Sequence, residues 1–297
     1  MNNNKLIIYI IGDGRSGSTI LEEYLARNLG GLKIGEARRF WKYYYEDETY
    51  CECGDHIKKC SFWKSVNEKL PEDIRNIHVH QRLGQVLFNF KNLLRTLGEN
   101  NPDTFLKYVQ NSFYKAIFNS TSANLIIDSS KISPWGIYLD QFSMFKNNVL
   151  FIHLVRDIAV TANSWKKDVT LPEYIDKEVK MPKRTLSKHL KSWLKVNLST
   201  IKYMKKEGNY IYIDYKDFCN DPNKLLLKIK NHGMFDDFSF DREVRGLHGI
   251  AGNPVRQETS EDLQIKYYNS TNNLNIFEKV VYATVRYCYL MFKYVNI

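Results

Sequence analysis

Short apolar runs alternate along the chain with longer segments in which apolar residues recur at helical spacing. Runs of strand length occupy residues 6–11, 32–34, 125–127, 149–155 and 210–213. Segments with apolar residues along one helical face occupy residues 20–29, 83–97, 105–117 and 182–206. Strands that alternate with helices in this way predict an α/β fold, a doubly wound parallel sheet flanked by helices.

The segment that joins the first predicted strand to the first predicted helix is rich in glycine. Residues 12–19 read Gly-Asp-Gly-Arg-Ser-Gly-Ser-Thr. Glycines let the backbone approach an anion, and the first turn of the following helix points free amide N–H groups at it. In the nucleotide-binding template GxxxxGK[ST] the lysine position is taken here by Ser18, and the loop carries its cation at Arg15. The sequence therefore predicts a P-loop-type sheet. Its glycine loop is expected to bind a related anion with a phosphate or sulfate group in preference to ATP. The alternative is a glycine turn without a ligand.

Polar side chains also follow the other predicted strands, each at the point where the strand ends. They are Glu36 after the second, Ser130 with Lys131 after the third, Arg156 after the fourth and Tyr215 after the fifth. Because ligands of such sheets bind beyond the carboxyl ends of the strands, we expect these side chains to share one site with the glycine loop. His153 lies inside the fourth strand and is expected to be a buried, hydrogen-bonded residue rather than a ligand.

The composition is that of a soluble globular protein with a surplus of positive charge. The 297 residues include 43 lysines and arginines against 33 aspartates and glutamates, a net charge of +10. This surplus favours an anionic ligand, an acidic substrate or a polyanion. The N-terminus lacks a secretory signal pattern, no apolar run has the length of a membrane span, and residues 276–294 are expected to form an amphipathic helix that packs on the core. We therefore expect a cytoplasmic protein.

Five cysteines, an odd number, indicate a reducing compartment. Cys51, Cys53 and Cys60 are clustered with His56 between them, which supplies four candidate zinc ligands. The usual C-x2-C pairs of zinc sites are absent, however. A contact or disulfide between Cys53 and Cys60 that closes a surface loop is at least as well supported.

Several of these segments together resemble the sulfotransferase superfamily, whose members transfer a sulfuryl group from 3′-phosphoadenosine 5′-phosphosulfate (PAPS). Gly14-Arg15-Ser16-Gly17-Ser18-Thr19 resembles the loop that binds the 5′-phosphosulfate. Leu154-Val155-Arg156-Asp157, with Ser164 eight residues after the arginine, resembles the 3′-phosphate site. Residues 213–222, which contain Tyr215, resemble the segment whose tyrosine lies near the nucleotide, and residues 51–63 and 248–256 resemble segments of bacterial members.

The resemblance implies PAPS as donor, 3′,5′-ADP (PAP) as product and no required metal. It also implies a set of nucleotide-binding residues, namely Gly14, Arg15, Ser16, Gly17, Ser18, Thr19, Arg156, Ser164, Tyr215, Gly252, Asn253 and Arg256. The histidines His78 and His80, in HxH spacing, are expected in a polar linker between helices and are not among the selected residues.

Three catalytic residues are implied by the same resemblance. Glu36 resembles the glutamate that acts as general base in protein-tyrosine and several carbohydrate sulfotransferases. Lys131 resembles a catalytic lysine, and Arg15 with the loop amides would stabilise charge on the leaving group. The alternative for Glu36 is that it only pairs with Arg38 or Arg39 and shapes the mouth of the acceptor site.

We expect a single domain over residues 1–297, in which about residues 37–120 form a helical and loop insertion on the acceptor side. The acceptor would be a hydroxyl or amine of a small molecule, a glycan or a peptide tyrosine, and neither nucleic acid nor a membrane span is expected. Two other functions stay open. A P-loop kinase is disfavoured by Ser18 and by Arg156, which stands where a magnesium-binding aspartate is expected. A non-catalytic binder of nucleotides or polyanions would use the basic surface alone.

Overall fold

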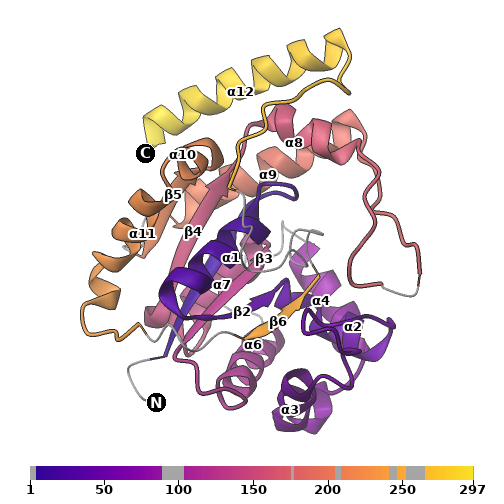
Figure 1. The fold of residues 1–297 in the computed structure, drawn as a ribbon, viewed down its shortest axis with the longest axis vertical. Helices are drawn as coiled ribbons and strands as arrows, with labels where there is room; N and C mark the ends of the chain where they lie inside the picture. The colour runs from indigo at the N-terminus through magenta and orange to yellow at the C-terminus, as the bar shows by residue number, and fades with distance from the viewer. Residues whose placement is uncertain are drawn as a thin grey trace.

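The computed structural model describes residues 5–88, 104–174, 177–204, 209–240, 246–251 and 265–296. Within them, six strands form one sheet in the order β5-β4-β1-β3-β2-β6, and every neighbouring pair is parallel (Figure 1). The strands are β1 (Leu6–Ile11), β2 (Leu32–Gly35), β3 (Leu125–Lys131), β4 (Val149–Val155), β5 (Tyr210–Asp214) and β6 (Leu247–Ile250). The strands β3, β2 and β6 lie on one side of β1, and β4 and β5 lie on the other. Because the sheet extends in both directions from β1 with parallel strands, the predicted doubly wound parallel sheet is confirmed.

Alternate side chains of β1 fill two different cores, as expected for a strand that is buried on both faces. The even-numbered side chains pack with α1 (Ser18–Leu29), α10 (Tyr215–Asn220) and α11 (Pro222–Lys230). The odd-numbered side chains pack with α6 (Thr104–Phe118) and α7 (Ser133–Phe142). His153 in β4 is fully buried between Tyr210 and Asn197, with hydrogen bonds of 2.7 and 2.8 Å, so its predicted role inside the sheet is confirmed.

The chain between β2 and β3 forms several helices that cover one side of the sheet. They are η1 (Ala37–Arg39), α2 (Phe40–Tyr45), α3 (Ser61–Lys69), η2 (Glu72–Ile74), α4 (His78–Phe88) and α6. Their aromatic side chains join them: the ring of Phe113 lies 5.5 Å from that of Phe40 and 4.8 Å from that of Trp41. These aromatic residues therefore build the core of the region.

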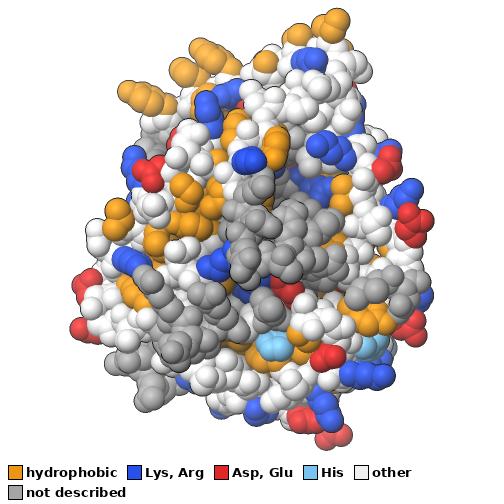
Figure 2. Space-filling model, in the orientation of Figure 1, with side chains coloured by type: hydrophobic (Ala, Val, Ile, Leu, Met, Phe, Trp, Pro, Cys, Tyr) orange, Lys and Arg blue, Asp and Glu red, His pale blue; other side chains and the backbone are white. Residues whose placement is uncertain are grey.

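A third core joins α8 (Ile158–Trp165), α9 (Leu186–Met204) and α12 (Ile276–Asn296), while η3 (Lys146–Asn148) and η4 (Gly233–Phe235) are single turns. The predicted amphipathic helix is confirmed as α12, in which Tyr282 and Tyr289 are buried against α8 and α9. Ile276 and Phe277 are nevertheless 81% and 68% exposed, and Figure 2 shows apolar side chains along the edge where α12 lies in Figure 1. Among the described residues, no helix is long and apolar enough to cross a membrane.

Three predictions about the extent or place of elements were wrong, and the first two concern β3 and α4. The third strand does not end at residue 127 but continues through Lys131, because its polar side chains are satisfied inside the protein. The Tyr114 hydroxyl, for example, donates to Asp128 at 2.6 Å. His78 and His80 do not lie in a linker but in the first turn of α4, where Val79 extends the buried face by one turn before Leu83.

The long helix expected over residues 182–206 begins only at Leu186, as α9. Residues 182–184 have no regular secondary structure and line a cavity instead, with Arg184 paired to Asp13. Residues 205–206 lie outside the described residues.

Candidate functional site

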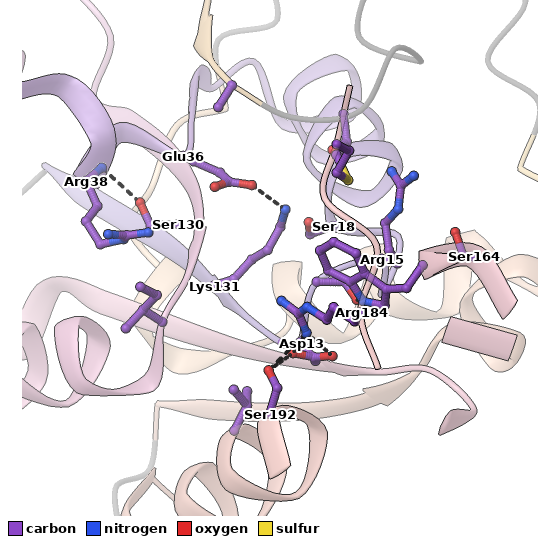
Figure 3. A pocket seen from close by; sticks show the side chains of 18 of the residues that line it. Asp13, Arg15, Ser18, Glu36, Arg38, Ser130, Lys131, Ser164, Arg184 and Ser192 are labelled. Carbon is purple, nitrogen blue, oxygen red and sulfur yellow. Dashed lines mark hydrogen bonds and ion pairs between the residues drawn. The ribbon is translucent and has the colours of Figure 1, made fainter. Parts of the chain in front are cut away.

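A cavity of about 530 Å³ lies at the carboxyl edge of the sheet (Figure 3). It is bounded by the loop after β1, the ends of β2, β3 and β4, the helices α8 and α9, and residues 171, 173 and 181–184. The predicted site residues that line it are Gly14, Arg15, Gly17, Ser18, Thr19, Glu36, Lys131, Arg156 and Ser164. The strand-end residues thus come together in space as the parallel topology requires.

Aromatic rings pack directly beneath the glycine loop. Gly17 caps α1 with a φ of 96°, and a Cβ atom built on it would lie 2.1 Å from the ring of Tyr215. A Cβ atom on Gly14 would lie 2.3 Å from the ring of Trp165, whose Nε1 donates to the Gly14 carbonyl at 3.2 Å. Tyr215 therefore supports the loop from behind instead of lining the cavity. Ser16 is also buried beneath the loop, and its hydroxyl has no hydrogen-bond partner among the described residues.

Arginine side chains gather at the mouth of this loop. Arg156 donates from Nη1 to the Arg15 carbonyl at 3.3 Å, and its guanidinium lies 4.6 Å from the centre of the Tyr215 ring. The Nε atoms of Arg15 and Arg156 are buried and have no partner among the described residues. Burial, together with the positive charges of Arg156 and Arg184, lowers the pKa of Arg15. Among the described residues, Arg15 and Arg156 form no ion pair, and two such cations side by side are suited to an anionic ligand.

The third arginine, Arg184, was missed by the sequence analysis. Its Nη1 lies 3.2 Å from Asp13 Oδ1, and Ser192 Oγ donates to the same oxygen at 2.6 Å. Its guanidinium stacks on the ring of Trp165 at 3.7 Å. The basic pair Lys183-Arg184 was visible in the sequence, but it follows no strand and so fell outside the pattern that selected the other residues.

Glu36 lies between two cations on the opposite side of the cavity. Lys131 Nζ is 2.6 Å from Oε1, and Arg39 Nε is 2.6 Å from Oε2. Burial acts to raise the pKa of Glu36, but the charges of Arg39 and Lys131 outweigh it and hold this pKa below its usual range. Figure 3 shows Lys131 between Glu36 and Ser18. An ionised carboxylate is therefore held beside a lysine that also faces the glycine loop.

The backbone has unusual conformations on both sides of the cavity, at Lys131 in the ion pair and at Arg15 in the glycine loop. Lys131 and Arg15 have φ values of 69° and 70°, the left-handed region that residues other than glycine seldom adopt. The N–H of Glu36 donates to the Ile250 carbonyl at 2.8 Å. Backbone strain of this kind costs of order 1–3 kcal/mol and is concentrated at functional sites.

A buried carboxyl group supports the site from α1. Glu22 accepts hydrogen bonds from the Gly35 N–H and from Ser129 Oγ, both at 2.7 Å. Burial raises the pKa of Glu22 to about 8, so the group is largely protonated at neutral pH. It joins α1 to the ends of β2 and β3 immediately before Glu36 and Lys131.

The far wall of the cavity contains Ser130, which was expected at this site, and the polar residues Arg38 and Glu173, which the sequence analysis did not select as site residues. The Arg38 N–H donates to Ser130 Oγ at 3.1 Å (Figure 3), and burial together with Arg39 lowers the pKa of Arg38 to about 10. Glu173 accepts a hydrogen bond of 2.9 Å from the Tyr43 hydroxyl, while its Oε2 atom is buried without a partner among the described residues. Gly252, Asn253 and Arg256, the other predicted nucleotide contacts, lie outside the described residues.

The clustered cysteines do not line this cavity. None of Cys51, Cys53 and Cys60 is part of a disulfide in the structure, so the disulfide between Cys53 and Cys60 is not formed. The histidine beside them is His248 and not His56, because β6 brings His248 against the thiols from almost two hundred residues away.

No protein-family model matches the sequence, and no curated protein sequence matches it. Solved structures resemble the fold. A sulfotransferase domain from the Synechococcus PCC 7002 olefin synthase has a TM-score of 0.43 and 18% identity, covering 94% of this chain and 94% of that chain. A sulfotransferase domain from the curacin biosynthetic pathway has a TM-score of 0.41 and 17% identity, covering 81% of this chain and 76% of that chain.

A retinol dehydratase in complex with androsterone and the inactive cofactor PAP has a TM-score of 0.36 and 12% identity, covering 96% of this chain and 80% of that chain.

Proposed function

We propose that the protein is a sulfotransferase that moves a sulfuryl group from PAPS to a hydroxyl or amine acceptor. The observation that carries this proposal is the charge of the cavity: nine lysines and arginines line it among the described residues, against three carboxylates. Uncompensated cations at the N-terminus of a helix bind a multiply charged anion. PAPS carries such charge at both its 5′-phosphosulfate and its 3′-phosphate.

The two charged ends of the donor have separate proposed partners. The glycine loop and Arg15 hold the 5′-phosphosulfate, since both Arg15 and the first turn of α1 line the cavity, and the Nε atom of Arg15 has no partner among the described residues. Arg156 and Ser164 hold the 3′-phosphate, and Tyr215 fixes the plane of the Arg156 guanidinium from below. Residues Gly252, Asn253 and Arg256 are retained as proposed contacts.

Glu36 is the proposed general base. It accepts the proton of the acceptor as the new bond to sulfur forms and the bond from sulfur to the bridging oxygen breaks. PAP leaves with the negative charge that develops on that oxygen. Arg15 and Lys131 stabilise this charge, an effect worth about 2.7–4 kcal/mol for a well-aimed donor. Transfer through a loose transition state otherwise depends chiefly on alignment of donor and acceptor.

Lys131 links the two halves of this reaction. Paired with Glu36, it depresses the basicity of that carboxylate. Contact of its ammonium group with the bridging oxygen of a bound donor would weaken the pair and move the pKa of Glu36 back toward its usual range. Because a base works best when its pKa approaches the operating pH, donor binding would then activate Glu36.

The region between β2 and β3 is the proposed acceptor side of a single domain. It contributes Arg38, Arg39 and Leu87 to the wall of the cavity next to Glu36. An acceptor that enters there reaches Glu36 before the glycine loop. A small molecule, a glycan or a peptide tyrosine remain the proposed acceptor classes.

The carboxylates favour this reaction over phosphoryl transfer from ATP with magnesium. Asp157, at the end of β4, caps α8 by accepting from the Ala159 and Val160 N–H groups at 2.9 and 3.1 Å. It also pairs with Arg286 at 3.0 Å, and it does not line the cavity. Asp13 is paired with Arg184. Neither carboxylate is placed as a ligand for a nucleotide-bound magnesium ion.

The test is thermal stabilisation of the purified protein by PAP, compared with 5′-AMP, 5′-ADP and ATP with magnesium. At about 100 times its dissociation constant, a ligand adds roughly 2.7 kcal/mol to the free energy of unfolding. We expect stabilisation by PAP alone, and its loss in Arg156→Gln and Ser164→Ala. The matched control is Arg286→Gln, which removes a neighbouring arginine that lies outside the cavity.

Transfer of radioactive sulfate from labelled PAPS to a panel of phenols, glycans and tyrosine peptides then identifies the acceptor. Stabilisation by ATP with magnesium but not by PAP would replace the proposal with a kinase. Stabilisation by none of the nucleotides would leave a polyanion-binding protein.

A further inference from the structure

Four side chains of metal-ligand type converge outside the cavity. Cys51, Cys53, Cys60 and His248 place one ligand atom each within 4.8 Å of one another. Nδ1 of His248 lies 3.7 Å from the sulfur of Cys51 and 3.4 Å from that of Cys60. With Zn–S bonds of about 2.3 Å and Zn–N bonds of about 2.0–2.1 Å, a tetrahedral zinc ion would separate sulfur from nitrogen by about 3.6 Å. The two recorded separations bracket this value.

The cluster is assembled from three separate parts of the chain. Cys51 and Cys53 lie on a turn closed by the hydrogen bond of the Gly54 N–H to the Cys51 carbonyl at 3.0 Å. Cys60 is the residue that precedes α3, and His248 lies in the edge strand β6. Cys51 and Cys60 are buried, whereas Cys53 is exposed and lies on the solvent side of the cluster. Such a closed set of four ligands is typical of structural zinc sites.

Neighbouring aromatic side chains fix the orientation of the histidine. The ring of Phe62 stacks on the imidazole with centres 4.8 Å apart and an interplanar angle of 16°. Nε1 of Trp63 donates to the His248 carbonyl at 2.9 Å. The stacked ring of Phe62 holds the plane of the imidazole with Nδ1 toward the thiols, and the bond from Trp63 fixes the backbone of His248.

We propose that Cys51, Cys53, Cys60 and His248 bind one structural Zn²⁺ ion. Three sulfur ligands and one nitrogen in tetrahedral arrangement select zinc among the common metals, because iron–sulfur clusters generally take four thiolates and magnesium takes oxygen ligands. A disulfide between two of the cysteines would leave the third thiol and the imidazole without a role. Binding releases the thiol protons and involves no redox change.

The ion would link the edge of the sheet to the loop before α3. In the same region the Glu52 N–H donates to the Gly249 carbonyl at 3.2 Å, and the Gly249 N–H donates back to the Glu52 carboxylate at 3.3 Å. The next residue, Ile250, accepts the hydrogen bond from Glu36. The site thus supports the backbone at Glu36 through β6, and none of its ligands lines the cavity.

The first measurement is the metal content of the full chain purified under reducing conditions, by inductively coupled plasma mass spectrometry. We expect about one zinc per chain, and X-ray absorption should give three sulfur ligands and one nitrogen ligand. Cys51→Ser, Cys60→Ser and His248→Asn should each lose most of the metal. Matched controls are Cys219→Ser, Cys288→Ser and His56→Asn, which alter the same residue types outside the cluster and should keep it.

A second measurement does not depend on whether the variants fold. Modification of the thiols of the wild-type protein with a mercurial should release one equivalent of zinc, which a chromogenic chelator detects. Cobalt added to chelator-treated protein should give the visible absorption of a tetrahedral thiolate site. Absence of bound zinc or cobalt, iron in place of zinc, or a disulfide within the cluster in reduced protein would each overturn the proposal.

Discussion

Glu36 is held as a carboxylate by two cations, and its basicity depends on which of them it keeps. In the structure both Lys131 and Arg39 lie 2.6 Å away, so the pKa of Glu36 is far too low for efficient proton transfer. A base of this kind is useful only if a reaction step withdraws one of the cations. The pairing with Arg39, expected as an alternative from the sequence, and a catalytic role are therefore compatible.

Replacement of Glu36 by glutamine should remove the group that accepts the proton and should leave nucleotide binding intact. We expect Glu36→Gln to lower the rate of sulfuryl transfer by about 10²–10⁴-fold, because that is the usual contribution of a positioned base. Stabilisation by PAP should be unchanged. The exposed Glu46→Gln serves as control. Wild-type turnover in Glu36→Gln would remove this residue from the role of base.

Glu22 makes the stability of the fold depend on pH. Burial raises the pKa of Glu22 to about 8 in the native state, above the value of about 4.5 that applies in the unfolded chain. The native state therefore holds a proton that the unfolded state has released. This group stabilises the protein below pH 4.5, and that contribution is lost as the pH rises toward 8, by up to about 1.4 kcal/mol per pH unit.

The glutamine of Glu22→Gln is neutral at every pH. Its carbonyl oxygen can accept the hydrogen bond from the Gly35 N–H, and its amide group lies within reach of the Ser129 hydroxyl. We expect its free energy of unfolding, relative to wild type, to rise steadily between pH 5 and pH 8 in urea titrations. Glu23→Gln on the same helix is the control. The charges of Lys33 and Arg27 lower the pKa of Glu23, so this group is ionised in both the native and the unfolded state above pH 5, and its replacement should leave a stability curve parallel to that of wild type between pH 5 and pH 8. Parallel stability curves for Glu22→Gln and wild type would contradict the argument.

At the scale of elements, the loop between β1 and α1 works as one unit with the start of α10. The ring of Tyr215 occupies the space that a side chain at position 17 would need, and the same ring lies against Arg156. The anion-binding loop and the arginine after β4 are thus positioned by one buried tyrosine. This explains why Tyr215 is essential to the arrangement although it does not line the cavity.

Gly17→Ala should accordingly be costly in two ways. A residue with a Cβ atom at the left-handed φ of 96° loses roughly 1–2 kcal/mol of stability. The clash of this Cβ atom with Tyr215 costs roughly 1–3 kcal/mol more. We expect a loss of about 2–5 kcal/mol in the free energy of unfolding, measured by urea denaturation, and loss of PAP binding.

Gly54→Ala is the matched control for this substitution. Gly54 has a φ of 93°, and no atom lies within 4 Å of its added Cβ. It should therefore show the backbone cost alone and retain PAP binding. Equal destabilisation of the two variants would show that Tyr215 does not constrain the loop.

At the scale of the whole molecule, the site exists because parallel strands end at one edge. The chain crosses the sheet repeatedly, so residues as distant as Arg15 and Arg156 arrive within hydrogen-bond distance. Their shared positive charge is tolerated because the surrounding core fixes them, through the stacking of Arg156 on Tyr215 and of Arg184 on Trp165. An anionic ligand would relieve this repulsion, which is why stabilisation by PAP is expected in the unfolding of the entire domain and not only at the loop.

Local sequence patterns predict five of the six strands of the sheet, the glycine loop and the polar residues at the strand ends, whereas the edge strand β6 was not predicted. These features depend on local patterns: an apolar run of six residues, a loop that requires glycine, and side chains one step beyond each strand. Such local patterns therefore predict Arg15, Glu36, Lys131 and Arg156 as site residues, and all of them line the cavity.

The tertiary structure, and not the local sequence, brings in the distant residues that complete the charged cluster of the cavity and the cysteine cluster. Asp13 and Arg184 are 171 residues apart, and Cys60 and His248 are 188 residues apart. No periodicity connects such pairs, because their contact depends on how loops fold over a finished sheet. The sequence placed His56 with the cysteines since it is their neighbour along the chain, whereas the sheet brings in His248 at its edge. Local order thus follows from local chemistry, and the partners of a charged or metal-binding group follow from the fold.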